Sequence, residues 1–150
     1  MNRAYCQLLK YKLDQWQNQH SMFDIIVGIE TEGVRIGYQL AEMMELPFTI
    51  IPHNRTDFEQ LAKPSWGNNP HFLIVDDIVT TGLSMLRGVD FLEIEEKQET
   101  VTFACMIRRN PANLDYSAVH GDRSKEELHI MDRRFDSIDK RLVSLFNEPE

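Results

Sequence analysis

The stretch that decides the fold is FLIVDDIVTTGLS, residues 72–84. Four apolar residues run into two adjacent carboxylates, Asp76 and Asp77, and a Thr-Thr-Gly segment follows after two further residues. A short apolar run bounded by turn residues predicts a buried strand over 71–75 that ends at the acids. Residues 83–92 then continue at helical spacing. A buried strand that ends on two neighbouring carboxylates indicates that something outside the fold uses them.

The same alternation of strands and helices extends along the chain. Strands are predicted at short apolar, β-rich runs, namely residues 24–29, 46–52, 71–75 and 100–107, with shorter ones at 116–120 and 127–131. Helices are predicted where apolar residues recur at helical spacing, at residues 3–18, 34–44, 83–92 and 135–146. Residues 53–70 are polar and predict a long loop. The pattern predicts an α/β fold, a Rossmann-like parallel sheet flanked by helices.

Composition limits the classes of function. The 150 residues, 42% hydrophobic and 27% charged, predict one globular domain. A formal net charge of −8 disfavours a nucleic-acid partner, although helix-terminal amides can still bind a small anion. Cys6 and Cys105 indicate reduced thiols rather than a disulfide framework. The sequence shows neither a signal-peptide pattern nor a membrane-spanning apolar run, so we expect a cytoplasmic protein without a membrane partner.

Three loops are expected to meet at one edge of the predicted sheet. In doubly wound parallel sheets, ligands bind beyond the carboxyl ends of the strands. This rule brings together GIETEG after the first strand, HNRTDF after the second and DDIVTTGLS after the third, at residues 28–33, 53–58 and 76–84. The most unusual segments of the sequence therefore converge on the expected ligand site.

The segment Thr80–Ser84 has the chemistry of a phosphate cradle. Gly82 permits backbone conformations that other residues avoid, and the first amides of the following helix have no internal partner. Three hydroxyl groups and the helix dipole add to this attraction. Asp76 and Asp77 suit vicinal hydroxyls or hydrated Mg²⁺, so the pair and the cradle together describe a ribose 5-phosphate. An Asp-Asp turn followed by an ordinary helix cap remains an open alternative.

The order of these residues resembles the signature of type I phosphoribosyltransferases, which bind 5-phosphoribosyl-1-pyrophosphate (PRPP). The shared pattern is an apolar strand, Asp-Asp, two residues, Thr-Thr-Gly, one residue, and Ser or Thr. The resemblance implies that Asp76 and Asp77 are catalytic, contact the ribose hydroxyls and orient Mg²⁺ through water. It implies a substrate-binding loop made of Ile78, Val79, Thr80, Thr81, Gly82, Leu83 and Ser84.

Residues 28–47 resemble the pyrophosphate-binding loop of the same family and the helix after it. The Gly-x-x-Thr-x-Gly spacing and the trailing Leu-Pro are closest to orotate and adenine phosphoribosyltransferases. The resemblance implies pyrophosphate contacts by Glu30, Thr31, Glu32 and Gly33. The glutamates depart from a family that often carries Arg or Lys there. They would repel pyrophosphate unless Mg²⁺ lies between or they point away, and both interpretations stay open.

The second loop resembles the family's mobile flap, which closes over the transition state. Arg55 follows the second strand as an Arg or Lys does in several members, and the resemblance implies a catalytic role for it as a pyrophosphate ligand. His53 and Lys63 are weaker candidates, because an exposed His or Lys in a loop is usually only solvated.

The nucleobase stays open. The segment MIRRNP, residues 106–111, resembles one in hypoxanthine-guanine enzymes, and Arg108 takes the position of their base-contacting Lys. A solvated Arg108 at a strand end is the alternative. Thr80 stands where those enzymes carry an Asp, which argues against a standard 6-oxopurine enzyme.

The resemblance covers residues 23–110. It implies one phosphoribosyltransferase-like domain, with the helix at 3–18 before this core and a small hood at 111–150 after it. The expected protein is a homodimeric, Mg²⁺-dependent enzyme that transfers phosphoribosyl from PRPP to a nucleobase and releases pyrophosphate. A catalytically inactive regulator that binds PRPP or a nucleotide is the alternative from another class. A hydrolase on the same fold is a third possibility.

Overall fold

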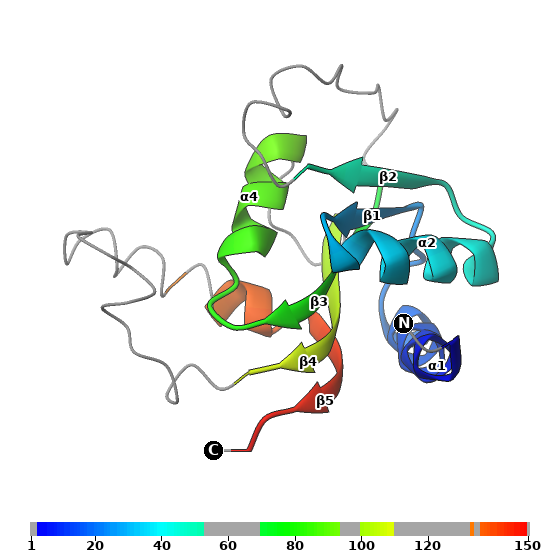
Figure 1. Cartoon of the computed structure of the whole chain (residues 1–150). Coiled ribbons are helices and arrows are strands. Elements are labelled where there is room, and N and C mark those ends of the chain that lie inside the picture. Colours follow the sequence, from blue (N-terminus) through cyan, green and yellow to red (C-terminus); the bar gives the residue numbers. More distant parts are fainter. Residues whose placement is uncertain (1–2, 53–69, 94–99, 110–132, 134–135, 150) are drawn as a thin grey trace.

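The centre of the molecule is a parallel β-sheet. The computed structural model describes residues 3–52, 70–93, 100–109, 133 and 136–149. Within them the sheet has five strands in the order β2-β1-β3-β4-β5, with every neighbouring pair parallel (Figure 1). The strands are β1 (Ile25–Ile29), β2 (Phe48–Ile51), β3 (Phe72–Val79), β4 (Val101–Arg108) and β5 (Leu142–Asn147). The predicted parallel sheet is therefore confirmed.

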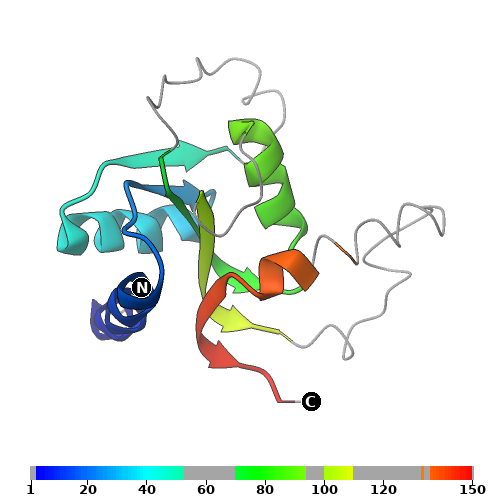
Figure 2. The same ribbon diagram turned by 180° about the vertical axis from the view of Figure 1, so that it is seen from behind.

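Helices cover both faces of this sheet, as Figures 1 and 2 show from opposite sides. The helices are α1 (Arg3–Gln19), α2 (Glu32–Met44) and α4 (Leu83–Leu92). Along β3, Phe72 and Ile74 pack in the core under α4, whereas Leu73 and Val75 pack in the core under α1 and α2. Because β3 is buried on both faces, its sequence begins with a continuous apolar run instead of an alternating one.

The order of the strands reverses between β1 and β3. After β1 the chain enters α2 on one face of the sheet and continues to β2. After β3 it enters α4 on the opposite face and continues to β4. Both connections therefore start at the carboxyl edge of the sheet, but one leads to β2 beside β1 and the other leads to β4 beside β3. Such a switch point is where doubly wound sheets bind their ligands.

Strand β3 is longer than the sequence predicted. The prediction ended the strand at residue 75, but β3 continues through both acids to Val79. The end of β4 supplies the partners, since Asp76 pairs with Cys105 and Val79 pairs with Arg108. Aspartate is uncommon in strands, and the neighbour that supports this extension comes from a distant part of the chain. The acids therefore lie within the last paired residues of the sheet.

The predicted helix over 135–146 is wrong. In the described part of this segment, only residues 136–139 are helical, and Leu142–Asn147 form β5. Leu142 packs against the core under α4, whereas Val143 is buried in the core on the other face. This alternation is that of a strand, although the apolar spacing alone also fits a helix. Pairing with β4 decides the outcome.

The other predicted helices and strands that are described agree closely with the structure. The predicted strands at 116–120 and 127–131, nearly all of the loop at 53–70 and most of the hood at 111–150 lie outside the described residues. None of the helices in the described ranges is long and apolar enough to cross a membrane.

Candidate functional site

The two neighbouring acids at the end of β3 differ in exposure. Asp76 is 9% exposed, whereas Asp77 is intermediate. The backbone N–H of Asp77 donates to Asp76 Oδ1 at 2.8 Å, and the N–H of Ile78 donates to Asp77 Oδ1 at 2.8 Å. Each carboxylate thus accepts the amide of the residue that follows it. Asp77 is the more accessible of the two to a ligand.

Burial places Asp76 in an unfavourable electrostatic position. Loss of hydration raises the pKa of Asp76 to about 7, and the Asp77 carboxyl adds to the rise. The hydrogen bond from the Asp77 amide acts in the opposite direction. A cation or a hydroxyl donor beside these carboxylates would favour their charged forms. The pair is therefore suited to a ligand that brings positive charge or hydrogen-bond donors.

The loop after β1 lies directly against the strand that carries the acids. A Cβ added at Gly33 would lie 2.5 Å from the backbone oxygen of Val75 and 3.1 Å from the Asp76 Cα. A Cβ at Gly28, in β1, would lie 2.7 Å from the oxygen of Gly33, in the first turn of α2. Only glycine allows such an approach of one backbone to another. This packing brings the predicted pyrophosphate loop next to the acids, and the Glu30–Thr31 peptide bond within it is cis.

Two helices begin at this edge without a capping side chain. Among the described residues, neither Thr31 before α2 nor Gly82 before α4 makes a side-chain cap hydrogen bond. Gly82 has φ 82°, in the left-handed region that favours glycine. The hydroxyl of Thr81 accepts a hydrogen bond from the Leu83 N–H at 3.3 Å, so one amide is satisfied locally. Helix N-termini bind anions, and two at one edge suit a ligand with two phosphate-bearing ends.

The two glutamates of the first loop occupy different positions. Glu30 is exposed, whereas Glu32 is intermediate and lies in the first turn of α2. Glu32 Oε2 lies 3.9 Å from Arg35 Nη1, one turn further along the same helix. The helix dipole also favours an acidic residue in the first turn. These contacts favour the interpretation in which Glu32 points away from a bound pyrophosphate.

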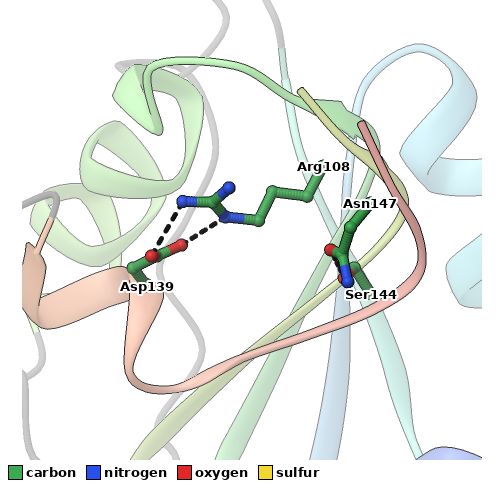
Figure 3. A network of polar contacts seen from close by, with 4 residues as sticks. All are labelled: Arg108, Asp139, Ser144 and Asn147. Atoms are coloured by element: carbon green, nitrogen blue, oxygen red, sulfur yellow. Dashed lines mark hydrogen bonds and ion pairs between the residues drawn. The ribbon is translucent and has the colours of Figure 1, made fainter. Parts of the chain in front are cut away.

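Arg108 is held by a carboxylate that the sequence analysis did not identify. Its Nε and Nη2 donate to the two oxygens of Asp139 at 2.5 and 2.8 Å (Figure 3). The Arg108 side chain is 29% exposed, so it is neither buried nor freely solvated. Asp139 lies in the segment that was predicted to be a continuous helix. Nothing in its local sequence indicated that it would meet the end of β4.

The predicted site residues 78–84, from the end of β3 to the start of α4, differ in their exposure to solvent. Val79 is buried in the core under α4, so it offers a ligand only its backbone. The predicted site residues of this loop that are at least partly exposed are Ile78, Thr80, Thr81, Leu83 and Ser84. The flap candidates Arg55, His53 and Lys63 lie outside the described residues.

The donor atoms at this edge fit Mg²⁺ bound together with a substrate. In the described ranges no group of three or more His, Cys, Asp and Glu is arranged to hold a metal ion. Asp76 and Asp77 nevertheless supply carboxylate oxygens, the ligand type that Mg²⁺ prefers. Mg²⁺ commonly uses one or two protein carboxylates, several waters and the phosphates of a substrate. The acid pair is compatible with that mode and not with an all-protein metal cage.

Comparisons with solved structures identify the same fold in enzymes of known class. The adenine phosphoribosyltransferase of Giardia lamblia, complexed with 9-deazaadenine, matches with a TM-score of 0.63 and 15% identity, over 97% of this chain and 80% of that one. The orotate phosphoribosyltransferase of Aeropyrum pernix matches with a TM-score of 0.55 and 20% identity, over 96% and 70% of the two chains. At these identities the matches establish the fold alone.

Sequence comparisons establish the family. A bifunctional protein PyrR of Caldicellulosiruptor saccharolyticus is 26% identical over 140 residues, covering 79% of this chain and 76% of the relative. The family model for the phosphoribosyl transferase domain matches residues 7–125, which is most of the chain. That range contains both the loop after β1 and the Asp-Asp strand with its phosphate-cradle segment. The chain therefore belongs to the phosphoribosyl transferase domain family.

Proposed function

We propose that the protein transfers a phosphoribosyl group from PRPP to a nitrogenous base, with Mg²⁺, and releases pyrophosphate. The observation that carries this proposal is the contact of Gly33 with the backbone of Val75 and Asp76. It joins the loop after β1 to the acid-bearing strand at the switch point of the sheet. PRPP needs such an arrangement, because its pyrophosphate and its 5-phosphate lie on opposite sides of one ribose.

The proposed roles follow the positions of the residues. The segment Thr80–Ser84 and the start of α4 would hold the 5-phosphate, where an uncapped helix N-terminus attracts an anion. Asp77, the more accessible acid, would accept the ribose hydroxyls, with Asp76 behind it. The loop Glu30–Gly33 and the start of α2 would face the pyrophosphate, and Arg55 would approach it from the flap. Mg²⁺ would be oriented by Asp76 and Asp77 through water and, when bound, offsets the charge of the leaving pyrophosphate.

The reaction needs little covalent chemistry from the protein. A base nitrogen bonds to C1 of the ribose as the bond from C1 to the pyrophosphate oxygen breaks, through a transition state that resembles an oxocarbenium ion. The chain's contribution is to hold the ribose and the base in line and to stabilise the leaving group. Two phosphate sites on rigid helix starts provide that positioning.

Arg108 would face the base from the end of β4. A guanidinium group only donates hydrogen bonds, so it pairs with carbonyl oxygens and not with an exocyclic amino group. We therefore expect bases that carry a carbonyl group to react faster than adenine.

Direct measurement of pyrophosphate release tests the proposal. The protein is incubated with PRPP, Mg²⁺ and one base at a time from a panel of orotate, uracil, hypoxanthine, guanine, xanthine and adenine. We expect release that requires PRPP, Mg²⁺ and at least one of these bases. The enzyme proposal is rejected if none of the six bases supports release.

A regulatory protein that binds PRPP or a nucleotide without turnover is the second candidate. The exposed Glu30, beside the proposed pyrophosphate position, favours it because its charge opposes tight binding of the leaving group. The relative whose name describes it as bifunctional also motivates it. This candidate predicts that PRPP or a nucleoside monophosphate raises the melting temperature while the full panel gives no pyrophosphate.

The proposal includes a cytoplasmic homodimer that binds neither nucleic acid nor membrane. The buried free thiols of Cys6 and Cys105 support a reducing compartment. The formal net charge of −8 opposes binding to a nucleic-acid backbone. Sedimentation velocity would give the oligomeric state, and a dimer is the expected result.

A further inference from the structure

Arg108 lies beside the start of the proposed 5-phosphate loop. It pairs with Val79, the residue directly before Thr80, and the N–H of Arg109 donates to the Val79 oxygen at 2.8 Å. Val79 and Ile138, the neighbour of Asp139, both pack in the core under α4. The Arg108 guanidinium group, which is bound to Asp139, therefore lies on the face of the sheet that α4 covers. The proposed 5-phosphate loop continues into α4 on this same face.

Asp139 binds Arg108 from a short helix that is held in place by a buried side chain. Ile138 is 2% exposed and packs in the core under α4, which fixes the short helix before β5. From this helix the Asp139 carboxylate engages Nε and Nη2 of Arg108 together, as Figure 3 shows. A two-point contact of this kind fixes the plane of the guanidinium group as well as its position.

The stability that this ion pair contributes is small. The side chains of Arg108 and Asp139 are 29% and 46% exposed. Solvent screens a pair at such exposure, so its net contribution to folding is small. Its geometric effect is larger, because the two-point contact fixes the orientation of a long side chain at the end of β4.

We propose that Asp139 is a positioning residue that orients the Arg108 guanidinium toward the base. This inference rests on the proposed phosphoribosyl transfer. Asp139 does not touch the base. It fixes the N–H groups of Arg108, so that they donate to a carbonyl oxygen of the base in one geometry. Without Asp139, Arg108 keeps its charge but loses the two-point contact that fixes the plane of its guanidinium group, and the base binds less tightly.

The chain contains a matched control at the next residue. Arg109 Nε lies 3.3 Å from Glu148 Oε2, and these side chains are 44% and 28% exposed. This second pair joins the residue after β4 to the residue after β5, where the Glu148 N–H also donates to the Arg108 oxygen at 2.8 Å. Arg109 meets Glu148 through one guanidinium nitrogen instead of two, and we assign Glu148 no role in the site. Removing its charge controls for general loosening of the strand ends.

The first experiment compares Asp139→Asn with Glu148→Gln in steady-state kinetics. For Asp139→Asn we expect KM for the base to rise about ten- to a hundredfold, with KM for PRPP unchanged. Glu148→Gln should leave both KM values unchanged. Equal effects of the two substitutions, or a rise in KM for PRPP alone, would overturn the proposal.

A charge swap separates positioning from stability. The double variant Arg108→Asp with Asp139→Arg can re-form the ion pair but moves the guanidinium group from the end of β4 to the short helix before β5. We expect the swap to recover the melting temperature of the wild type and to keep the high KM for the base. Recovery of the base KM along with the melting temperature would show that the pair is only structural. Asp139→Glu retains the charge, so its KM for the base should lie between those of the wild type and Asp139→Asn.

The failure of this inference is distinguishable from failure of the proposed function. If the wild type releases no pyrophosphate with any base, the proposed transfer is rejected and this inference, which depends on it, is rejected with it. If the wild type is active and Asp139→Asn behaves like Glu148→Gln, only the role of Asp139 is rejected.

Discussion

Strand β3 has a buried titratable group near each end, and the two groups have opposite surroundings. His71, just before the strand, is 2% exposed. Its Nε2 lies 2.8 Å from Thr102 Oγ1, its Nδ1 lies 3.0 Å from Ser21 Oγ, and its backbone N–H donates to Asp24 Oδ2 at 2.7 Å. Asp76, toward the other end, is also buried, but it lies beside the carboxyl group of Asp77, which raises its pKa.

The comparison separates a polar site that is satisfied within the protein from the proposed ligand site. The surroundings of His71 satisfy both ring nitrogens within the protein, with the Met22 oxygen 3.2 Å from Nδ1 as a further contact. Asp76 receives the amide of Asp77 and at the same time the repulsion of its carboxyl group. A buried network that is satisfied stabilises a fold. A buried acid beside a second acid, at the edge where α2 and α4 begin, supports the proposed ligand site.

The largest expected effect comes from the accessible acid. Asp77→Asn should lower the rate of pyrophosphate release by about 10²–10³-fold, because it removes the charge proposed to hold the ribose and to orient Mg²⁺. Its melting temperature should stay near that of the wild type, since Asp77 is only partly buried. Steady-state assays and thermal melts measure the two effects. A variant that keeps wild-type turnover would remove Asp77 from the site.

The next effect tests the contact between the two loops. Gly33→Ala places a Cβ 2.5 Å from the Val75 backbone oxygen, so the loop after β1 must move away from β3. We expect turnover to fall by at least about tenfold and the free energy of unfolding to fall by about 1–3 kcal/mol.

Gly88→Ala is the matched control for this change. Gly88 is also a buried helical glycine, but its added Cβ would meet the Cδ1 atom of Ile51 at 2.8 Å, the end of a side chain that can rotate. We expect near-normal turnover from this variant. If both glycine variants lose turnover equally, the approach of the first loop to β3 has no special role.

A smaller effect is expected at the other end of the strand. His71→Ala leaves the buried Thr102 hydroxyl without its imidazole partner and should cost about 1–3 kcal/mol of unfolding free energy. The folded variant should bind PRPP and release pyrophosphate as the wild type does. Chemical denaturation and turnover per folded molecule check this, and a selective loss of turnover would contradict a purely structural His71.

The last prediction concerns how the free energy of unfolding changes with pH, by at most about 1.4 kcal/mol per pH unit for one group. Asp76 and His71 are expected to change it in opposite directions. Burial and Asp77 raise the pKa of Asp76 from 3.8 to about 7, so the folded protein retains a proton that the unfolded chain loses. Its contribution to stability therefore falls as pH rises from about 4 to 7. Burial lowers the pKa of His71 below 6.5, so its contribution falls as pH drops below that value.

Unfolding experiments in Mg²⁺-free buffer across this range can separate the two contributions. Asp76→Asn should remove the loss of stability toward pH 7, and His71→Gln should reduce the loss in acid. The assignment fails if either variant changes the slope in the opposite direction.

Local patterns in the sequence were sufficient to predict the order of strands and helices through β4 and the meeting of the first and third loops. The run FLIV and the segment Thr80–Ser84 are continuous in the chain, so their chemistry is visible without a structure. The length of β3, the strand at 142–147 and the Arg108–Asp139 pair depend on contacts between segments far apart in the sequence. Periodicity and composition carry no information about such contacts.

The Arg108–Asp139 pair also explains why the two original interpretations of Arg108 were incomplete. The sequence offered either a solvated side chain or a base contact. The structure shows an arginine that is partly exposed and held by Asp139, in the short helix before β5. A partner 31 positions away cannot be identified from spacing alone.

Titration calorimetry of PRPP with Mg²⁺ tests most directly the claim that the ligand binds at the Asp76–Asp77 end of β3. Wild type, Asp77→Asn and His71→Gln are compared at one pH and one Mg²⁺ concentration, below the melting temperature of each. The account predicts equal Kd values for wild type and His71→Gln, and binding at least about tenfold weaker for Asp77→Asn. Equal binding by wild type and Asp77→Asn, or no binding of PRPP to the wild type, would contradict it.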